Sequence, residues 1–353
     1  MDILKLLKMV MAKKSSDLHI IAGAPPVIRV HGQLTFTDMD PLEDEDIRKL
    51  LEPILNDDLK EKLAKEKELD FSYDFDDNAR FRINMYWQRG TLAAAFRLVA
   101  SEILDLNKLK LPSIVRDMAF KERGLILVTG PTGSGKSTTL AAMIDIINKE
   151  QRRHIITLED PIEYTYTHKK SIISQREIGI DTFSFGTALR ECLRQDPDVI
   201  LIGEMRDLET ISIAITAAET GHLVLGTLHT TDAVQTIDRI IDVYPPYQQH
   251  QIRTQLALTL QAVISQRLLI QKDGKGRIPA VEIMTVTPAI RNLIREAKTY
   301  QIYSNIETGS ETGMLTLDQA LENLINEDLI SVDEAVKASP EPESFKSKLG
   351  LEK

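Results

Sequence analysis

Cysteine is nearly absent from this chain, since Cys192 is the one instance among 353 residues. A single cysteine can form neither an internal disulfide nor a cysteine-rich zinc site, so both are excluded. We expect Cys192 to behave as a small, buried apolar residue. This cysteine usage fits a reducing compartment.

Long apolar runs are also missing. No stretch of about 20 apolar residues, the length that crosses a bilayer, occurs in the sequence, and we expect no direct membrane span. Residues 1–14 mix apolar and basic side chains without the unbroken apolar core of a signal peptide. We expect an amphipathic helix there that packs on its own domain, with binding to a membrane surface as the alternative.

Positive charge is not in excess either, because the formal net charge is -10 at pH 7. Proteins that bind nucleic acid usually need a basic face to displace counterions from phosphates. The chain has no basic stretch with interleaved aromatic residues, so we expect no nucleic-acid partner. Hydrophobic residues make up 42% of the chain, which is enough to build sizeable cores in about two domains.

The first part of the chain has the pattern of a small α+β domain. Segments 71–75, 81–85 and 91–99 predict strands, and Asp76-Asp77-Asn78 predicts a hairpin turn. Residues 41–67 are charged and helical in period, and Pro53 divides them into two helices. We predict an N-terminal domain at 1–99, a linker at 100–112 and a C-terminal domain at 113–353.

Continuous apolar runs appear after Gly124, at 125–128, 155–158, 199–202 and 223–225. Strands that are buried on both faces of a parallel sheet have this composition. Helical segments separate the runs, and repeated strand–helix units predict an α/β fold. From Pro245 onward we expect helix, followed by a polar tail.

A phosphate-binding loop follows the first of these runs. Residues 130–137 read GPTGSGKS and fit the P-loop pattern G-x-x-x-x-G-K-[ST] in full, with a predicted strand before them and a predicted helix after them. Glycines let backbone N–H groups converge on phosphate oxygens, and the helix N-terminus adds partial positive charge. The predicted nucleotide-binding residues are Gly130, Pro131, Thr132, Gly133, Ser134, Gly135, Lys136, Ser137 and Thr138.

Two residues of the P-loop carry side-chain chemistry. Lys136 can place a positive charge against the β- and γ-phosphate oxygens, and the Ser137 hydroxyl is a ligand for Mg²⁺. The predicted cofactors are therefore ATP and Mg²⁺.

Hydrolysis also needs an acid near Mg²⁺ and a group that orients or deprotonates the attacking water. Glu204 follows the run at 199–202, where the carboxyl end of a parallel strand is expected, although the aspartate usual at this position is absent. A second acidic group, Glu159, Asp160 and Glu163, follows the run at 155–158. A bound Mg²⁺ would compensate these carboxylates, and an ordinary acidic loop is the alternative.

Two histidines bracket the run at 223–225, His222 before it and His229 after it. Each could donate a hydrogen bond to phosphate or be an ordinary structural histidine. Their positions at opposite ends of one strand argue against joint metal ligation.

These motifs, in this order, resemble the type II/type IV secretion ATPase superfamily. They are the P-loop, the acidic residues at 159–163, GEMRD at 203–207 and the histidine segment 221–230. Residues 289–296, AIRNLIRE, match the signature of its branch of type IV pilus retraction ATPases. The resemblance extends from Ser16 to about Ser331. It implies an α/β fold, with a RecA-like P-loop ATPase core and a smaller N-terminal PAS-like α+β domain.

The resemblance also implies roles for site residues. By resemblance, Glu163 is at the position of the general base that deprotonates water, and Glu204 is at the position of the Walker B acid that acts on Mg²⁺. His229, with His222, is at the position of a sensor of the γ-phosphate. Arginines of the N-terminal domain neutralise phosphate charge in this family, and a solvated surface charge is the alternative for each. The arginines that fit are Arg82 and Arg97, followed by the weaker candidates Arg80 and Arg89.

For the whole molecule, the resemblance implies a homohexameric motor in the cytoplasm, at the cytoplasmic face of the inner membrane. Its expected partners are a platform protein of the inner membrane and the pilus machinery, and its expected work is pilus retraction and twitching motility. Residues 289–296 also predict an amphipathic helix, with Ile290, Leu293 and Ile294 on one face. By resemblance this helix is a coupling element, and a surface helix with a salt bridge is the alternative.

Three other functions are weighed against this one. Assembly and secretion ATPases of the superfamily commonly carry a four-cysteine zinc module and a longer N-terminal region, neither of which occurs in this sequence. A RecA-like DNA translocase is opposed by the acidic charge of the chain. A non-enzymatic, ATP-gated scaffold is opposed by the presence of both acidic groups that hydrolysis needs.

Overall fold

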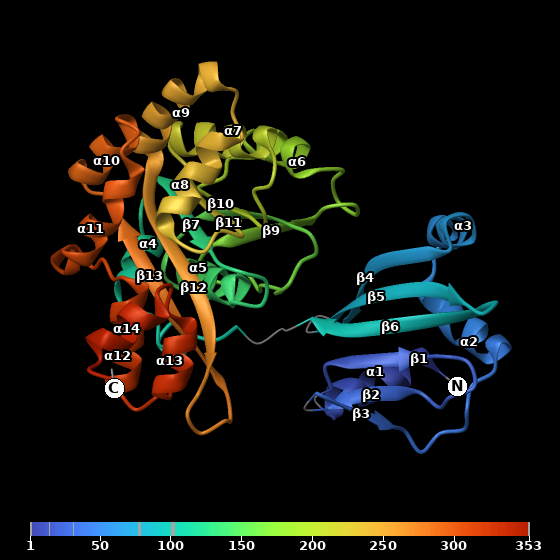
Figure 1. Ribbon diagram of the computed structural model, residues 1–353. Helices are drawn as coiled ribbons and strands as arrows, with labels where there is room; N and C mark the ends of the chain where they lie inside the picture. The colour runs from blue at the N-terminus through green and yellow to red at the C-terminus, as the bar shows by residue number, and fades with distance from the viewer. Residues whose placement is uncertain (1, 14, 31, 77–78, 100–102, 352–353) are drawn as a thin grey trace. The chain divides into compact units, whose positions relative to one another are not determined.

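The computed structural model describes residues 2–13, 15–30, 32–76, 79–99 and 103–351 (Figure 1). The chain divides into two compact units, Met1–Glu102 with Pro161–Thr165, and Ile103–Asp160 with Tyr166–Lys353. The domain boundaries expected at 99 and 112 stay a prediction. Residues 100–102 of the expected linker lie outside the described residues.

The first unit contains a six-stranded antiparallel sheet in the order β3-β2-β1-β6-β5-β4. Its strands are β1 (Asp17–Ile20), β2 (Val27–Val30), β3 (Gln33–Phe36), β4 (Glu68–Asp76), β5 (Ala79–Gln88) and β6 (Thr91–Val99). The three strands expected in 71–99 are confirmed. The turn expected at 76–78 falls largely outside the described residues, which omit 77 and 78.

Helices bury one face of this sheet. They are α1 (Ile3–Ala12), α2 (Asp44–Leu51) and α3 (Asp57–Glu66), with the short 3-10 helix η1 (Glu52–Ile54) at Pro53. The amphipathic N-terminal helix is confirmed, since Ile3, Leu6, Leu7 and Val10 are buried in the core of this unit. Because successive strand residues point to opposite faces, Phe81 and Phe96 enter this core while Arg82 and Arg97 lie on the other face of the sheet.

The second unit is built on a seven-stranded sheet in the order β13-β12-β7-β11-β10-β8-β9. Its strands are β7 (Gly124–Thr129), β8 (His154–Glu159), β9 (Ile172–Glu177), β10 (Val199–Ile202), β11 (Leu223–Leu228), β12 (Leu260–Ile270) and β13 (Arg277–Thr285). All neighbouring pairs are parallel except β12–β13. The four apolar runs therefore form parallel strands, as the sequence predicts.

Helices cover both faces of this sheet, and alternate strand residues feed two cores. On β7, Leu125 and Leu127 enter one core, and Ile126 and Val128 enter the other. The first core is covered by α6 (Phe185–Cys192), α7 (Leu208–Glu219), α8 (Ala233–Asp242), α9 (Pro246–Thr259), α10 (Pro288–Arg295) and α11 (Ile302–Glu307). The second is covered by α4 (Ile114–Ala119) and α5 (Lys136–Glu150).

A third, smaller core lies against the outer parts of β12 and β13. It holds α12 (Leu317–Asn326), α13 (Val332–Ala338) and α14 (Pro342–Lys348), while η2 (Thr299–Gln301) and η3 (Ser310–Thr312) are short 3-10 turns before it.

Cys192 is buried as expected, and burial raises the pKa of its thiol to about 11. No helix in the part of the chain that the structure describes is long and apolar enough to cross a bilayer.

The expectation of helix throughout the region after Pro245 is wrong for residues 260–285. They form β12 and β13, the long orange hairpin of Figure 1. Residues 260–270 form a strand because they pair with an edge of β7 whose backbone groups would otherwise lack hydrogen-bond partners, with Val263 opposite Leu127. The expected amphipathic helix at 289–296 is confirmed as α10, whose Ile290 and Ile294 are buried.

Candidate nucleotide site

The P-loop joins the end of β7 to the start of α5 in a conformation that requires glycine. Gly130, Gly133 and Gly135 have φ of 140°, 80° and 90°, in the region that side chains rarely adopt. A Cβ on Gly130 would lie 2.3 Å from the backbone oxygen of Gln266 on β12. The loop therefore packs directly against the neighbouring strand.

Polar side chains of β12 hold the base of this loop. Thr129, the last residue of β7, shares a hydrogen bond of 2.9 Å with Ser265. Thr139 of α5 donates to Gln266 Oε1 at 2.8 Å. The four side chains are buried, so these hydrogen bonds fix β7, α5 and β12 relative to one another around the loop.

The groups that line the loop suit a polyphosphate. Lys136 Nζ donates to the Gly130 and Pro131 carbonyls at 2.8 and 3.1 Å, which places its positive charge across the loop. Ser134 Oγ is buried and has no hydrogen-bond partner among the residues that the structure describes. Ser137 and Thr138 lie half-buried in the first turn of α5, where the helix dipole favours an anion. Cationic, hydroxyl and N–H donors thus converge, and the site fits a nucleotide's phosphates.

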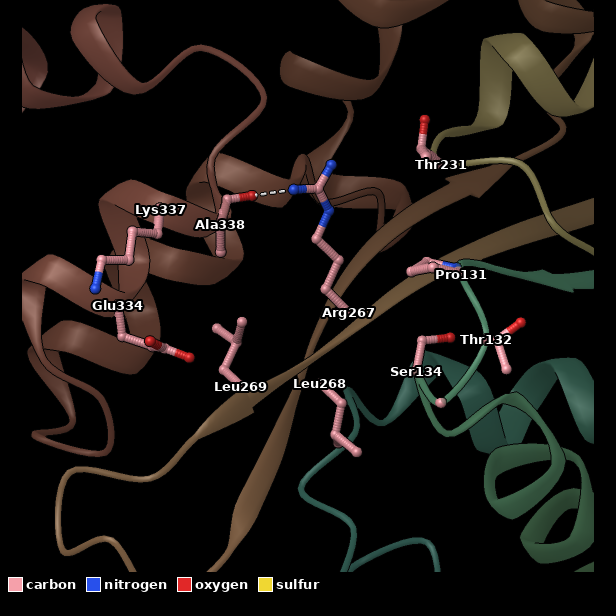
Figure 2. Close-up of a pocket in the computed structure, with 11 residues that line it drawn as sticks. Pro131, Thr132, Ser134, Thr231, Arg267, Leu268, Leu269, Glu334, Lys337 and Ala338 are labelled. Carbon is pink, nitrogen blue, oxygen red and sulfur yellow. Dashed lines mark hydrogen bonds between the residues drawn. The ribbon is translucent and has the colours of Figure 1, made fainter.

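Two cavities flank the loop. One, of about 430 Å³, is bounded by residues 131–134, Thr231 and Arg267, together with Glu334, Lys337 and Ala338 of α13. Figure 2 shows Arg267 reaching from β12 to the Ala338 carbonyl, with the P-loop side chains on the other side of the cavity. The other cavity, of about 330 Å³, adjoins Gly135, Thr138 and Thr139 and has apolar walls from Leu104, Leu109, Leu268, Ile278 and Pro279.

Glu204 and His229 lie together at the carboxyl ends of β10 and β11. The Gly203 N–H donates to the Leu158 carbonyl at 2.7 Å, and the Met205 N–H donates to the Thr227 carbonyl at 3.0 Å, so the backbone around Glu204 is held on both sides. Glu204 Oε1 lies 2.9 Å from His229 Nε2 and also pairs with Arg206. The hydrogen bond to Glu204 raises the pKa of Arg206.

Mg²⁺ is compatible with this arrangement, although its ligands stay a prediction. No group of three or more His, Cys, Asp or Glu side chains that could hold a metal ion occurs among the described residues. Mg²⁺ needs no such cage, because it commonly takes one or two protein oxygens, substrate phosphates and water. The Ser137 hydroxyl and the Glu204 carboxylate are oxygen donors of this kind, and both belong to segments at the carboxyl edge of the sheet.

The second acidic group divides into a structural part and an exposed part. Glu159 ends β8, is buried, and accepts hydrogen bonds from Thr157 Oγ1 at 2.6 Å and Gln175 Nε2 at 3.4 Å. This carboxylate is therefore held by protein donors. Glu163 lies beyond β8, in the segment before β9, and is exposed.

His222 lies away from the P-loop of its own chain, and its role as a γ-phosphate sensor stays a prediction. It precedes β11, and its Nδ1 lies 2.9 Å from the Ala217 carbonyl of α7. β11 has six residues and therefore spans about 20 Å, and it runs parallel to β7. His222 thus lies at the amino edge of the sheet, whereas the P-loop and His229 lie at the carboxyl edge.

Three of the four predicted arginines, Arg80, Arg82 and Arg97, lie on one face of the sheet of the first unit. Arg82 and Arg97 are directly opposite each other on β5 and β6. Arg82 pairs with Asp70 at 2.6 Å, and Arg97 pairs with Asp17 at 3.0 Å while keeping 73% of its side chain exposed. Arg80 pairs with Asp74, and Arg89 has a φ of 50° in the turn between β5 and β6. A role toward phosphate stays a prediction for all four.

Sequence reasoning missed the contribution of β12. Ser265, Gln266 and Arg267 interrupt an apolar run with three polar residues in a row, and each now lies against the P-loop or its cavity. The interruption was the available signal, but it indicates a site only once this segment is known to pair with β7.

Comparisons with known proteins agree with this geometry. The family model described as "Type II/IV secretion system protein" matches residues 2–335. The type IV pilus retraction ATPase PilT of Pseudomonas aeruginosa is 49% identical over 98% of this chain and 100% of its own length. A twitching motility protein of Neisseria gonorrhoeae is 48% identical over 98% of this chain and 92% of its own. The chain belongs to the type II/IV secretion system protein family, in the branch of the pilus retraction ATPases.

A solved structure supports the same assignment. The crystal structure of the pilus retraction motor PilT with bound ADP matches 98% of this chain and 99% of its own, with a TM-score of 0.92 and 48% identity. The fold is thus the N-terminal domain and RecA-like core of the secretion ATPases, as the motifs predict. Nucleotide binding by that relative agrees with the converging donors of the P-loop.

Proposed function

We propose that this chain is the ATP-hydrolysing subunit of a homohexameric motor that retracts type IV pili. The observation that carries the proposal is the hydrogen-bonded pair of Glu204 and His229, held at the sheet edge where the P-loop begins. The branch signature on α10 and the relatives that match nearly the whole chain support pilus retraction as the work done.

Each residue of the site has a proposed task. Lys136 and the P-loop N–H groups bind the phosphates, and Glu163 orients and deprotonates the attacking water. His229 reports the state of the γ-phosphate to Glu204 through their contact. Mg²⁺, when bound by Ser137 and Glu204, would neutralise charge that develops on the phosphates. The cavity beside Thr138, with its apolar walls, takes the nucleoside.

The remaining features of the proposal concern the assembly. Arg82 and Arg97, which pair with Asp70 and Asp17 on a sheet face away from the core of their unit, are proposed to neutralise phosphate charge when domains close. The motor acts in the cytoplasm, at the cytoplasmic face of the inner membrane, on a platform protein of the pilus machinery. The α10 helix is proposed as an element that couples the motor to this machinery.

The direct test is steady-state ATP turnover with Mg²⁺, together with light-scattering mass in the same buffer. Lys136→Ala should lower turnover by about 100-fold or more, because it removes the charge that faces the phosphates. Lys149→Ala is the matched control, since Lys149 lies in the last turn of the same helix and pairs with Asp145. A hexamer with equal turnover in all three proteins would contradict the assigned site, and a monomer at all protein concentrations would contradict the assembly.

A further inference from the structure

Glu282 on β13 is a buried carboxylate that no proposed step uses. Only 5% of its surface is exposed. Its Oε1 accepts a hydrogen bond of 2.8 Å from the N–H of Ala233, the first residue of α8. Burying a carboxylate costs free energy, so a side chain this deep needs compensation from fixed donors. Here the compensating donor is the N-terminus of a helix.

This carboxylate lies in one transverse row of the sheet with the P-loop strand. Glu282 is opposite Ser265, Ser265 is opposite Thr129, and Thr129 is opposite Leu228. Residues in such a row point to the same face, and Thr129 and Ser265 are hydrogen-bonded to each other. Thr129 immediately precedes the P-loop, and Leu228 immediately precedes His229. The row therefore connects Glu282 with the two strands that lead into the P-loop and into His229.

The segment His229–Asp232, called here the sensor loop, is short and fixed at two ends. Its first end continues β11, which pairs with β7. Its second end is α8, where Asp232 caps Gln235 N at 2.8 Å and Glu282 takes the Ala233 N–H. Within the loop, Thr230 Oγ1 lies 2.6 Å from Thr236 Oγ1 of α8. These contacts tie the position of His229 to the position of the α8 N-terminus.

We propose that Glu282 is a positioning residue of the ATPase site, which anchors the N-terminus of α8 to β13 and so sets where His229 meets Glu204 and the γ-phosphate. The inference rests on the proposed sensing role of His229. Glu282 touches no substrate in this account, and its effect passes through the sensor loop.

Titratable and charged groups on α8, α11, α12 and β12 act on Glu282. Burial is the largest influence and raises the pKa of Glu282 to about 7, while the Ala233 N–H opposes the rise. Asp232 of α8 and Asp318 of α12 raise this pKa further, and Arg267 of β12 lowers it. Tyr303 of α11 is also within electrostatic range. Both protonation states keep an acceptor oxygen for Ala233, so the anchor does not depend on ionisation.

The test is a double-mutant cycle on the full-length protein, with kcat and KM for ATP as readouts. Glu282→Ala should lower kcat by roughly 10-fold or more with KM changed less than about 3-fold, because the P-loop is unaltered. Glu282→Gln keeps the acceptor oxygen and should restore kcat to within about 3-fold of the parent. Glu322→Gln, which removes a carboxylate of α12 that pairs with Lys348, is the control for an unspecific loss of charge.

A second variant removes the same hydrogen bond from its donor side. Ala233→Pro deletes the N–H, and proline suits the first position of a helix, after an extended residue such as Asp232. It should lower kcat as Glu282→Ala does. This variant keeps the inference testable if Glu282→Ala does not fold, which thermal unfolding and circular dichroism would reveal.

The His229→Ala background separates the two proposals. If Glu282 acts through His229, Glu282→Ala should cause no further loss of kcat once His229 is alanine. Losses that multiply in the double variant, or full activity of Ala233→Pro, would overturn the positioning role while leaving the proposed function intact. A His229→Ala protein with unchanged kcat would instead refute the sensing role, and the inference with it.

Discussion

At the scale of single residues, similar carboxylates have different tasks because their surroundings differ. Glu159 is buried and held by Thr157 and Gln175, Glu204 is part-exposed beside His229, and Glu282 is buried against a helix N-terminus. Sequence position alone placed Glu159 and Glu163 in one acidic group. In the structure Glu159 is buried and accepts hydrogen bonds from the protein, whereas Glu163 is exposed. Burial and hydrogen-bond donors, which show a carboxylate to be structural, are not visible in the sequence.

The pKa of Glu282 predicts how its replacement changes stability with pH. Its pKa is about 7 in the folded chain and 4.5 as the ordinary value, so its stabilising contribution is full below pH 4.5 and is lost as pH rises through 7. Glu282→Gln cannot ionise and should be more stable than the parent at pH 8, by roughly 1–3 kcal/mol. Thermal unfolding at pH 5 and pH 8 checks this, and an advantage of the variant that is equal at both pH values would contradict it.

At the scale of elements, the P-loop depends on its contact with β12. Gly130→Ala would put a methyl group against the Gln266 carbonyl, which the pairing of β12 with β7 and β13 holds in place. Gly133 also has a positive φ but no atom near its Cβ position, so Gly133→Ala adds only backbone strain. We expect Gly130→Ala to be less stable than Gly133→Ala by about 1–3 kcal/mol. Thermal unfolding without nucleotide measures the difference, and equal stability would refute the contact.

The elements that could be predicted from the sequence are those with a strong local pattern. The apolar runs of β7, β8, β10 and β11, and the amphipathic helices α1 and α10, have the strand and helix patterns that they adopt. β12 and β13 were missed because β12 pairs with β7, a strand more than 100 residues earlier in the chain, and β13 joins the sheet only through β12. A local pattern contains no information on such a partner.

At the scale of the whole molecule, motif order predicted the fold and the family, and the structure adds how the site is built. The P-loop, Glu204 and His229 could be placed because parallel strands end at one edge of a sheet. The support from Ser265 and Gln266, and the anchoring of α8 by Glu282, required the tertiary contacts. His222 lies at the opposite edge of the sheet, as its position before β11 indicates.

The central claim, an ATPase in which Glu163 activates water, is tested most directly by Glu163→Gln. We expect this variant to bind ATP and to keep the mass of the parent assembly, while its turnover falls by about 100-fold or more. Glu66→Gln, at an exposed glutamate in the last turn of α3, is the control and should hydrolyse ATP like the parent. A Glu163→Gln protein with the parent's turnover would contradict the assignment of the catalytic base. Residues 159–163 would then be interpreted as an ordinary acidic loop.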